Sequence, residues 1–325
     1  MNYPQVSVII PTYLREDQLV NTIQDVIAQD YPNFEVLVID QTLEHQPETT
    51  SYLQQVAKEN KIKLYNLNWA SLPGARNYGV RRAKGEIIVF IDDDVKLEKT
   101  FLKSHVKNYE NQEIGAVAGR VFDRLILSES APDFTVEDLP KEADDPGIAW
   151  FHLDLVHTIK AQPVISARGC NMSFRKEIFD KHRLFFDERY GGSAIREESD
   201  FCLKIRKTGY KIWYDPEAFL VHLNEPIGGC HDLGTKTLKY QLTLYHNHFL
   251  MAFNHLNLAQ LWRLSVKMFD CHVFGNPPCN KPGSLGVQIV RSVFYFLGFL
   301  YAILTWIKSL WDDGQIYSKL DINGD

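Results

Sequence analysis

Three consecutive carboxylates follow the clearest strand pattern in the chain. The apolar run EIIVFI at 86–91 leads directly into Asp92, Asp93 and Asp94. Side chains alternate along an extended strand, so Asp92 and Asp94 are expected to face the same way. Clustered carboxylates repel one another, and a divalent cation removes that cost. The cluster therefore predicts a metal that bridges the protein to a phosphate-bearing ligand, with an N-cap for a helix over 95–106 as an equal alternative.

A second acidic cluster opens a predicted helix over 197–208. Glu197, Glu198 and Asp200 occupy its first turn, and the Gly-rich stretch YGGS at 190–193 leads into them. Acidic residues in a first turn are ordinary complements of the helix dipole. A Gly-rich approach, however, lets the backbone come close to a ligand, and a carboxylate beside an acceptor hydroxyl can act as a general base. Both interpretations stay open on the residues alone.

Two further side chains are candidates for the same chemistry. Arg76 lies in the first turn of the predicted helix over 75–83, where its guanidinium could clamp a phosphate, whereas Arg81 and Arg82 are expected on a solvated face. His222 ends the apolar run FLVH, one short strand after the acidic helix. A lone histidine is more often structural than a ligand, but this position makes His222 a candidate third metal ligand.

The elements that must position these residues alternate along the first hundred residues. Strand patterns at 5–10, 34–40, 62–67 and 86–91 alternate with helical patterns at 16–29, 48–60 and 75–83. This order predicts βαβ units and a mainly parallel sheet covered on both faces. Ligands bind beyond the carboxyl ends of such strands, where Thr12, Tyr13 and Asp40 lie together with the aspartate cluster.

Composition and missing motifs exclude several classes of protein. The chain has 325 residues, is 45% hydrophobic and carries a net charge of -6, which argues against a nucleic-acid partner. There is no GxxxxGK[ST] phosphate loop, no GxGxxG after the first strand and no GxSxG elbow, which disfavours P-loop ATPases, dinucleotide dehydrogenases and α/β-hydrolases. The five cysteines are odd in number and form no CxxC pair, so we expect reduced thiols in a cytoplasmic protein.

Two segments differ from this pattern. Residues 124–147 are acidic and aperiodic and predict a long loop. Beyond 235 the chain is mostly helical and rich in aromatic residues, and 293–307 is apolar throughout between Arg291 and Lys308. That run is short of the roughly 20 residues that span a bilayer. It predicts an interfacial or re-entrant membrane helix, with a buried core helix, or one that packs on a partner subunit, as a nearly equal alternative.

The motifs taken together resemble one family. VSVIIPTYLRED, VLVIDQT, GARNYGVRRAKGEIIVFIDDDV, GCNMSFRKEIF with FDERYGG, and REESDFCLKIRKTGYKIWYDPEAFLVH stand in the order seen in family 2 glycosyltransferases. The resemblance covers roughly residues 4–225. It implies a GT-A fold: a Rossmann-like, mainly parallel mixed sheet flanked by helices. It also implies an inverting transferase that uses a nucleotide-diphospho-sugar, a UDP- or GDP-sugar, with Mn²⁺ or Mg²⁺.

The resemblance also assigns residues. It implies that Thr12, Tyr13 and Asp40 form the nucleoside-binding edge and that Asp92 and Asp94 form the metal-binding pair, with Asp94 the likelier direct ligand. Together with the candidates argued above, we expect a donor-binding set of Pro11, Thr12, Tyr13, Arg15, Asp40, Arg76, Asp92 and Asp93, and a metal held by Asp92, Asp94 and His222. Glu198 aligns with the second acid of the family's ED pair, which acts as the base, and Glu197 is the alternative base. Gln41 stands where a second Asp is frequent.

We expect three regions: a nucleotide-sugar-binding half over 1–115, an acceptor-binding and catalytic half over 116–232, and a helical extension over 233–325. The expected acceptor is a saccharide or a lipid-linked glycan, at the inner face of the plasma membrane. Two alternatives remain, a sugar-1-phosphate nucleotidyltransferase and a catalytically inactive sugar-binding relative. The first would need a Gly-rich basic signature where this chain has PTYLRED, and the second would be expected to lose the aspartate pair or the base.

Overall fold

The first third of the chain forms a parallel sheet. The computed structural model describes residues 3–123, 141–151, 158–231, 238–277, 279 and 281–311. β1 (Val6–Thr12) lies between β2 (Phe34–Asp40) and β4 (Ile87–Ile91), and β3 (Lys63–Asn66) pairs with β2, all in parallel. The connections are α1 (Asp17–Ile27), α2 (Pro47–Lys58) and α3 (Leu72–Arg82), which confirms the predicted βαβ order.

The second half of the sheet is mixed. β8 (Asn171–Arg175) runs antiparallel to both β4 and β6 (Ile114–Asp123), and β9 (Lys211–His222) runs parallel to β6. β5 (Val95–Leu97) and β7 (Gln162–Val164) both pair with β9. The strand order along the sheet is β3-β2-β1-β4-β8-β6-β9-β5, and β7 lies off this path. Short helices connect these strands: α4 (Phe101–Val106), η1 (Lys107–Glu110), η2 (Lys141–Asp144), η3 (Ala149–Phe151), α6 (Glu177–Asp180), α7 (Glu197–Arg206) and η5 (Gly229–His231).

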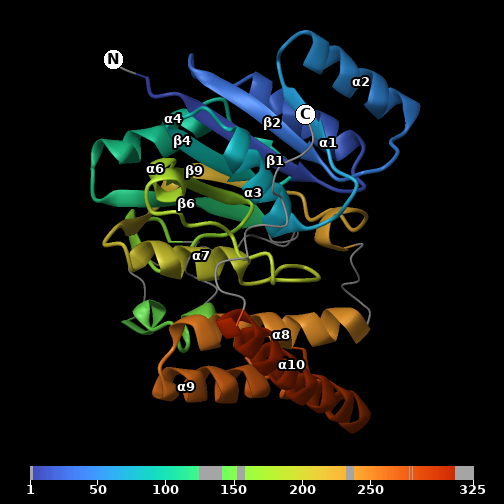
Figure 1. Cartoon of the computed structure of the whole chain (residues 1–325), viewed down its shortest axis with the longest axis vertical. Helices are drawn as coiled ribbons and strands as arrows, with labels where there is room; N and C mark the ends of the chain where they lie inside the picture. The colour runs from blue at the N-terminus through green and yellow to red at the C-terminus, as the bar shows by residue number, and fades with distance from the viewer. Residues whose placement is uncertain are drawn as a thin grey trace.

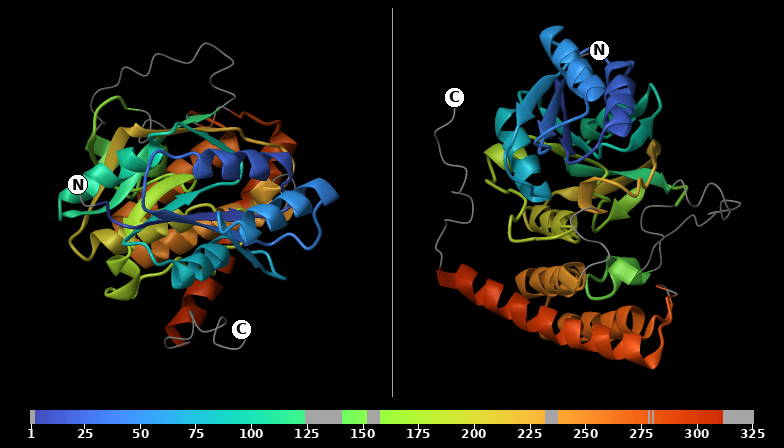
Figure 2. Two further views of the ribbon diagram at one scale, coloured as in Figure 1. Left: turned by 90° about the horizontal axis from the view of Figure 1, so that it is seen from above. Right: turned by 90° about the vertical axis from the view of Figure 1, so that its right-hand side faces the viewer.

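A helical layer completes the molecule. α8 (Leu238–His255), α9 (Leu258–Met268), the π-helical turn η6 (Phe269–Phe274) and α10 (Leu285–Trp311) follow one another. α8 lies under α7, and α9 and α10 lie on the far side of α8 from the sheet (Figures 1 and 2). The predicted helical C-terminal extension is thus a separate layer beneath the sheet.

Each face of the central strands packs into its own hydrophobic core. Ile9 and Phe90 belong to the core that includes α3, α7 and the helical layer, while Val8 and Val89 belong to the core under α1 and α4. All four side chains are fully buried. The unbroken apolar strands therefore reflect burial on both sides, as predicted.

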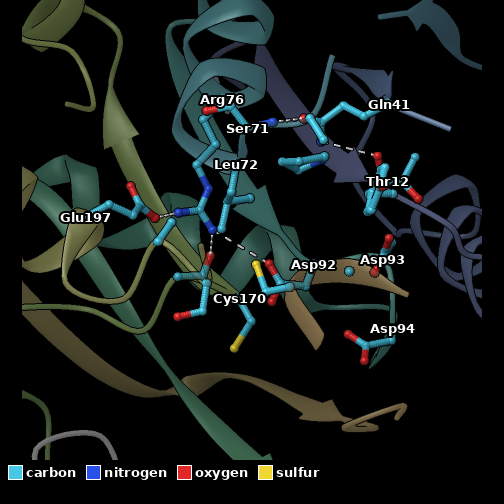
Figure 3. Close-up of a pocket in the computed structure, with 18 of the residues that line it drawn as sticks. Thr12, Gln41, Ser71, Leu72, Arg76, Asp92, Asp93, Asp94, Cys170 and Glu197 are labelled. Carbon is cyan, nitrogen blue, oxygen red and sulfur yellow. Dashed lines mark hydrogen bonds and ion pairs between the residues drawn. The ribbon is translucent and has the colours of Figure 1, made fainter. Parts of the chain in front are cut away.

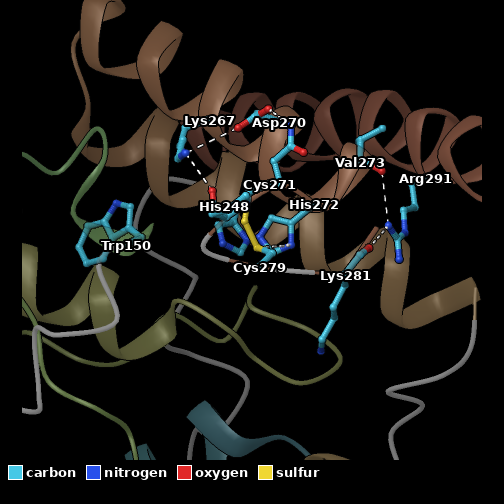
Figure 4. The surroundings of a disulfide bond; sticks show 12 residues. Trp150, His248, Lys267, Asp270, Cys271, His272, Val273, Cys279, Lys281 and Arg291 are labelled. Carbon is cyan, nitrogen blue, oxygen red and sulfur yellow. Dashed lines mark hydrogen bonds and ion pairs between the residues drawn. A yellow bond between two sulfur atoms is a disulfide. The ribbon is translucent and has the colours of Figure 1, made fainter. Parts of the chain in front are cut away.

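Two expectations are corrected. The segment after the aspartate cluster is not one helix over 95–106, because β5 pairs with β9 before α4 begins, so the aspartates do not cap a helix. Cys271 and Cys279 form a disulfide between η6 and the segment before α10, so the five thiols are not all reduced (Figure 4). Most of the predicted loop at 124–147 lies outside the described residues.

Candidate active site

A cleft of about 380 Å³ opens at the carboxyl ends of β1 and β4. The strand ends contribute Pro11, Thr12 and Tyr13 and the whole aspartate cluster, while α3 and α7 supply Arg76, Glu197 and Glu198 (Figure 3). Apart from Asp40, every residue that the sequence assigned to donor, metal or base lines this one cleft. The predicted convergence of strand ends is therefore what the fold produces.

The pairing of β5 with β9 brings His222 to the aspartates. Val95 stands opposite His222 in that antiparallel ladder. The Nε2 atom of His222 lies 3.2 Å from Asp94 Oδ1 and 3.8 Å from Asp92 Oδ2. One ligand atom from each of the three residues lies within 4.8 Å of the others. Two carboxylates and an imidazole in this arrangement suit a divalent cation, so the donor set fits the metal that the motifs imply.

Asp93 does not belong to this group and forms an ion pair with Arg15. The Arg15 Nε atom lies 3.3 Å from Asp93 Oδ1, and Nη2 donates to Asp94 Oδ2 at 3.1 Å. Nη1 donates to the carbonyl oxygens of Glu225 and Ile227, so one guanidinium joins the aspartates to the loop after β9. Gly228 allows that loop to close, because its φ is 81° and a Cβ there would lie 2.1 Å from the Leu14 carbonyl oxygen.

The pKa values of the two buried aspartates, Asp93 and Asp94, shift in opposite directions. Burial raises the pKa of Asp93 to about 7, although the charge of Arg15 opposes it. Burial also acts to raise the pKa of Asp94, but the hydrogen bond from His222 and the charge of Arg15 outweigh it and hold that pKa below its ordinary value. The Glu225 amide adds a hydrogen bond to Asp94 Oδ2 at 3.0 Å. Asp94 is therefore prepared as an anionic ligand.

Arg76 is an internal charge. Its side chain is 1% exposed, forms an ion pair with Glu197, and donates from Nη2 to the Gly169 carbonyl oxygen at 3.0 Å. The same Nη2 atom lies 3.7 Å from Asp92 Oδ1, so the guanidinium stands between α7 and the aspartate cluster (Figure 3). A clamp on phosphate, which the sequence suggested, would have to compete with these contacts.

Glu197 and Glu198 have opposite surroundings. The Glu197 side chain is 1% exposed and forms an ion pair with Arg76. Glu198 is half-buried, lines the cleft, and accepts a hydrogen bond from Ser199 Oγ at 3.2 Å. Adjacent helical side chains point about 100° apart, which explains why only one of the two faces the cleft.

Asp40 is buried beside the cleft and its oxygens already have partners. Oδ1 accepts from the Thr42 amide and Oδ2 from His45 Nε2, both at 2.9 Å. Gln41 lines the cleft in its place, with Oε1 accepting from the Ser71 amide at 2.6 Å. Gln41, which stands where the family frequently has a second Asp, is thus the one of the two that lines the cleft.

Several residues that line the cleft were not predicted from the sequence. Ser71 accepts from the Gly74 amide at 3.3 Å as the N-cap of α3, a signal that the serine before Pro73 could have given. Cys230 and Tyr240 reach the cleft from the loop after β9 and from α8, and nothing local marks them. Burial raises the pKa of Cys230 to about 12, which disfavours its thiolate form.

Comparison with known proteins identifies the class. In solved structures, the chain resembles Staphylococcus aureus TarS residues 1–349, with a TM-score of 0.58, 16% identity and coverage of 94% of this chain and 83% of that one. It also resembles the mannosyltransferase PcManGT from Pyrobaculum calidifontis, with a TM-score of 0.56, 19% identity and coverage of 96% and 89%. The fold is therefore that of the GT-A glycosyltransferases.

The family follows from the sequence match. The model for "Glycosyl transferase family 2" matches residues 7–182, and the chain belongs to this family of glycosyltransferases. Among curated relatives, the O-antigen biosynthesis protein RfbC of Myxococcus xanthus is 24% identical over 67% of this chain. The amylovoran biosynthesis glycosyltransferase AmsB of Erwinia amylovora is 25% identical over 63% of this chain and 65% of its own length. The chain spans only 17% of the RfbC protein.

Proposed function

We propose that this chain is a metal-dependent, inverting glycosyltransferase that moves a sugar from a UDP- or GDP-sugar to a hydroxyl of a saccharide or lipid-linked acceptor. The observation that carries the proposal is the shared cleft. It combines a candidate ligand set of Asp92, Asp94 and His222 with a separate carboxylate, Glu198, which forms no ion pair with another of the residues that the structure describes.

Asp92, Asp94 and His222 would hold Mn²⁺ or Mg²⁺, and the imidazole favours Mn²⁺. A divalent cation there neutralises charge on the departing diphosphate. Arg15 keeps Asp94 in place through a hydrogen bond of 3.1 Å, and Arg76 does the same for Asp92 at a longer distance. These two arginines act by positioning carboxylates that would otherwise repel one another.

Glu198 is the proposed base. It would accept the proton of the acceptor hydroxyl while that oxygen bonds to the anomeric carbon and the bond to the diphosphate breaks. Attack from the face opposite the diphosphate inverts the anomeric configuration. Glu197 is excluded from this role by its ion pair with Arg76, which holds the N-terminus of α7 and thereby the neighbouring Glu198.

The relatives support the substrate classes without fixing them. TarS has been crystallised with UDP and with UDP-GlcNAc, and PcManGT with GDP-Man and Mn²⁺. RfbC and AmsB are named for polysaccharide synthesis, and a Campylobacter jejuni relative, 35% identical over 29% of this chain, is named for glucosyl transfer to an undecaprenol-linked glycan. We therefore propose a nucleotide-sugar donor and a cell-surface glycan or lipid-linked acceptor, handled in the cytoplasm.

A thermal-shift panel tests the donor. UDP- and GDP-sugars are added to the full chain with Mn²⁺, and a true donor at 100 times its Kd should stabilise the fold by about 2.7 kcal/mol. Asp94→Asn should lose that shift while it keeps its own melting transition. If no nucleotide sugar raises the midpoint with metal present, the proposed donor class is wrong.

A further inference from the structure

The outer side of the C-terminal layer is apolar. On α9, Leu258, Trp262 and Val266 follow at intervals of four residues and are 85%, 71% and 50% exposed. This spacing places them in one stripe along the helix. Large apolar side chains exposed in a continuous stripe mark a contact surface, because soluble monomers rarely expose extended apolar patches.

α10 continues this surface. Its inner side packs on α8 and α9: Tyr295, Gly298 and Ala302 are buried, and the Tyr295 hydroxyl donates to the Ser265 carbonyl oxygen at 2.9 Å. A Cβ on Gly298 would lie 2.5 Å from Tyr245 Cβ, so the two helices touch closely. The opposite side exposes Ile289, Val293, Phe296, Leu297, Leu300, Leu304, Ile307, Leu310 and Trp311.

α10 is long enough to cross a bilayer but is held against the protein instead. It has 27 residues, its most apolar 18-residue window has a mean hydropathy of 1.7, and 17% of that window is buried. Thr305 near its end is bonded to His246 of α8 at 2.9 Å. α8 is in turn tied to the catalytic half by Asn247, which donates to the Gly191 carbonyl oxygen, and by His255, which lies 2.7 Å from Asp200 Oδ1. α10 thus lies along the layer (Figure 2).

The charges of this layer oppose those of the whole chain. The chain carries a net charge of -6, whereas residues 238–311 contain six Lys or Arg and a single acid, Asp270. Lys281 and Lys308 are exposed at the two ends of the α10 stripe. Cations that border an apolar stripe, with Trp262 and Trp311 on it, are complementary to anionic headgroups above acyl chains.

We propose that the exposed face of α9 and α10 docks on the surface of a bilayer that contains anionic lipids, with both helices lying in the interface. A second copy of the chain fits less well, because a two-fold contact through this face would bring like charges together. The apolar groove of about 680 Å³ between α9, η6 and α10, lined by Trp262, Val266 and Phe296, gives acyl chains a place to enter.

This surface is connected to the cleft. Tyr240 of α8 lines the catalytic cleft, while the far side of the same helix packs on α10. Docking would therefore hold the cleft at a fixed height above the membrane. If the proposed function holds, this arrangement suits an acceptor whose lipid end stays in the bilayer, but the docking itself requires no activity.

Vesicle flotation without donor or metal tests the docking. The full chain should float with phosphatidylcholine vesicles containing about 30% phosphatidylglycerol, and less with phosphatidylcholine alone or in 1 M salt. The double variant Trp262→Glu/Leu304→Glu should lose at least about tenfold in bound fraction, since it places two charges where apolar side chains would enter the bilayer. Ile159→Glu, at a side chain 47% exposed in the catalytic half, is the matched control and should float normally.

A second double variant, which removes two charges, tests the proposal independently in case Trp262→Glu/Leu304→Glu does not fold. Lys281→Ala/Lys308→Ala should fold normally and lose binding only to the anionic vesicles. Equal binding of wild type and both double variants would overturn the proposal. So would sedimentation of the wild type as a dimer that Trp262→Glu/Leu304→Glu dissociates, or resistance of the membrane-bound chain to alkaline carbonate, which would indicate a spanning helix.

Discussion

The guanidinium of Arg76 and the carboxylate of Glu197 form an ion pair in which each side chain is only 1% exposed. Arg76 lies on α3 and Glu197 begins α7, so the pair joins these two helices at the wall of the cleft. The Gly169 carbonyl oxygen and Asp92 complete the surroundings of the guanidinium. Two charges placed so deep need each other, since either alone would be an uncompensated buried charge.

Removing one member of this pair should destabilise the fold. Glu197→Gln removes the buried anion of Arg76 and leaves it only the more distant Asp92, at 3.7 Å, and breaking a buried ion pair costs about 3–5 kcal/mol. Urea unfolding should show that loss. Glu198→Gln is the matched control at the half-buried neighbour, and its midpoint should stay close to that of the wild type. Equal stability of both variants would show that Glu197 is not the structural anion.

Glu197→Gln and Glu198→Gln should also differ in their catalytic rates. Glu198→Gln keeps shape but cannot accept a proton, so kcat should fall by roughly 10²–10⁴-fold while the donor Kd barely changes. Steady-state kinetics with isothermal titration of the donor measures both. If Glu198→Gln transfers sugar at the wild-type rate, the base is another residue.

The buried His105 should make stability depend on pH. Its Nδ1 and Nε2 atoms lie 2.9 Å from Ser173 Oγ and Asn171 Oδ1. Burial lowers its pKa from 6.5 to about 4. Between these values the unfolded chain binds a proton that the folded protein excludes, so the unfolding free energy falls as the pH drops, by up to about 3 kcal/mol. His105→Gln should be less stable at pH 7 yet show a shallower decline between pH 6.5 and 4, and an unchanged slope would contradict this.

The Cys271–Cys279 disulfide should stabilise the C-terminal layer. It closes a loop with a sequence separation of 8, for which the loss of chain entropy in the unfolded state predicts roughly 2–3 kcal/mol. Dithiothreitol should lower the urea midpoint of the wild type and leave that of Cys279→Ser unchanged. A wild-type midpoint that is the same with and without reductant would refute the prediction.

Local patterns predicted the first four strands, their parallel pairing and the grouping of the aspartates, because continuous β-branched runs that end in polar residues are typical of buried parallel strands. They also put Asp92 and Asp94 on one side, which the geometry with His222 matches. They did not predict β5, β6, β7 and β8, and the second half of the sheet is mostly antiparallel. The partner of Arg76 was not predictable, since Glu197 is distant in sequence and reaches it only through the packing of α7 on the sheet.

The direction of the side chains at the strand ends could not be predicted from the sequence either. Asp40 and Gln41 are adjacent. Gln41 lines the cleft, whereas the Asp40 carboxylate is hydrogen-bonded to His45. The hydrophobic pattern of the sequence gives no indication that a side chain from the following loop, here His45, will hydrogen-bond to Asp40. The disulfide was missed for a similar reason, because a spacing of eight between two cysteines in a helical region resembles chance.

The most direct test of the metal-dependent transfer is release of nucleoside diphosphate from the donor identified by thermal shift. The wild type with Mn²⁺ should release it, excess EDTA should abolish release, and added Mn²⁺ should restore it. Asp94→Ala should be inactive under all three conditions while it retains the wild-type circular dichroism spectrum. Full release by the wild type in excess chelator, or by Asp94→Ala with Mn²⁺, would contradict the proposed mechanism.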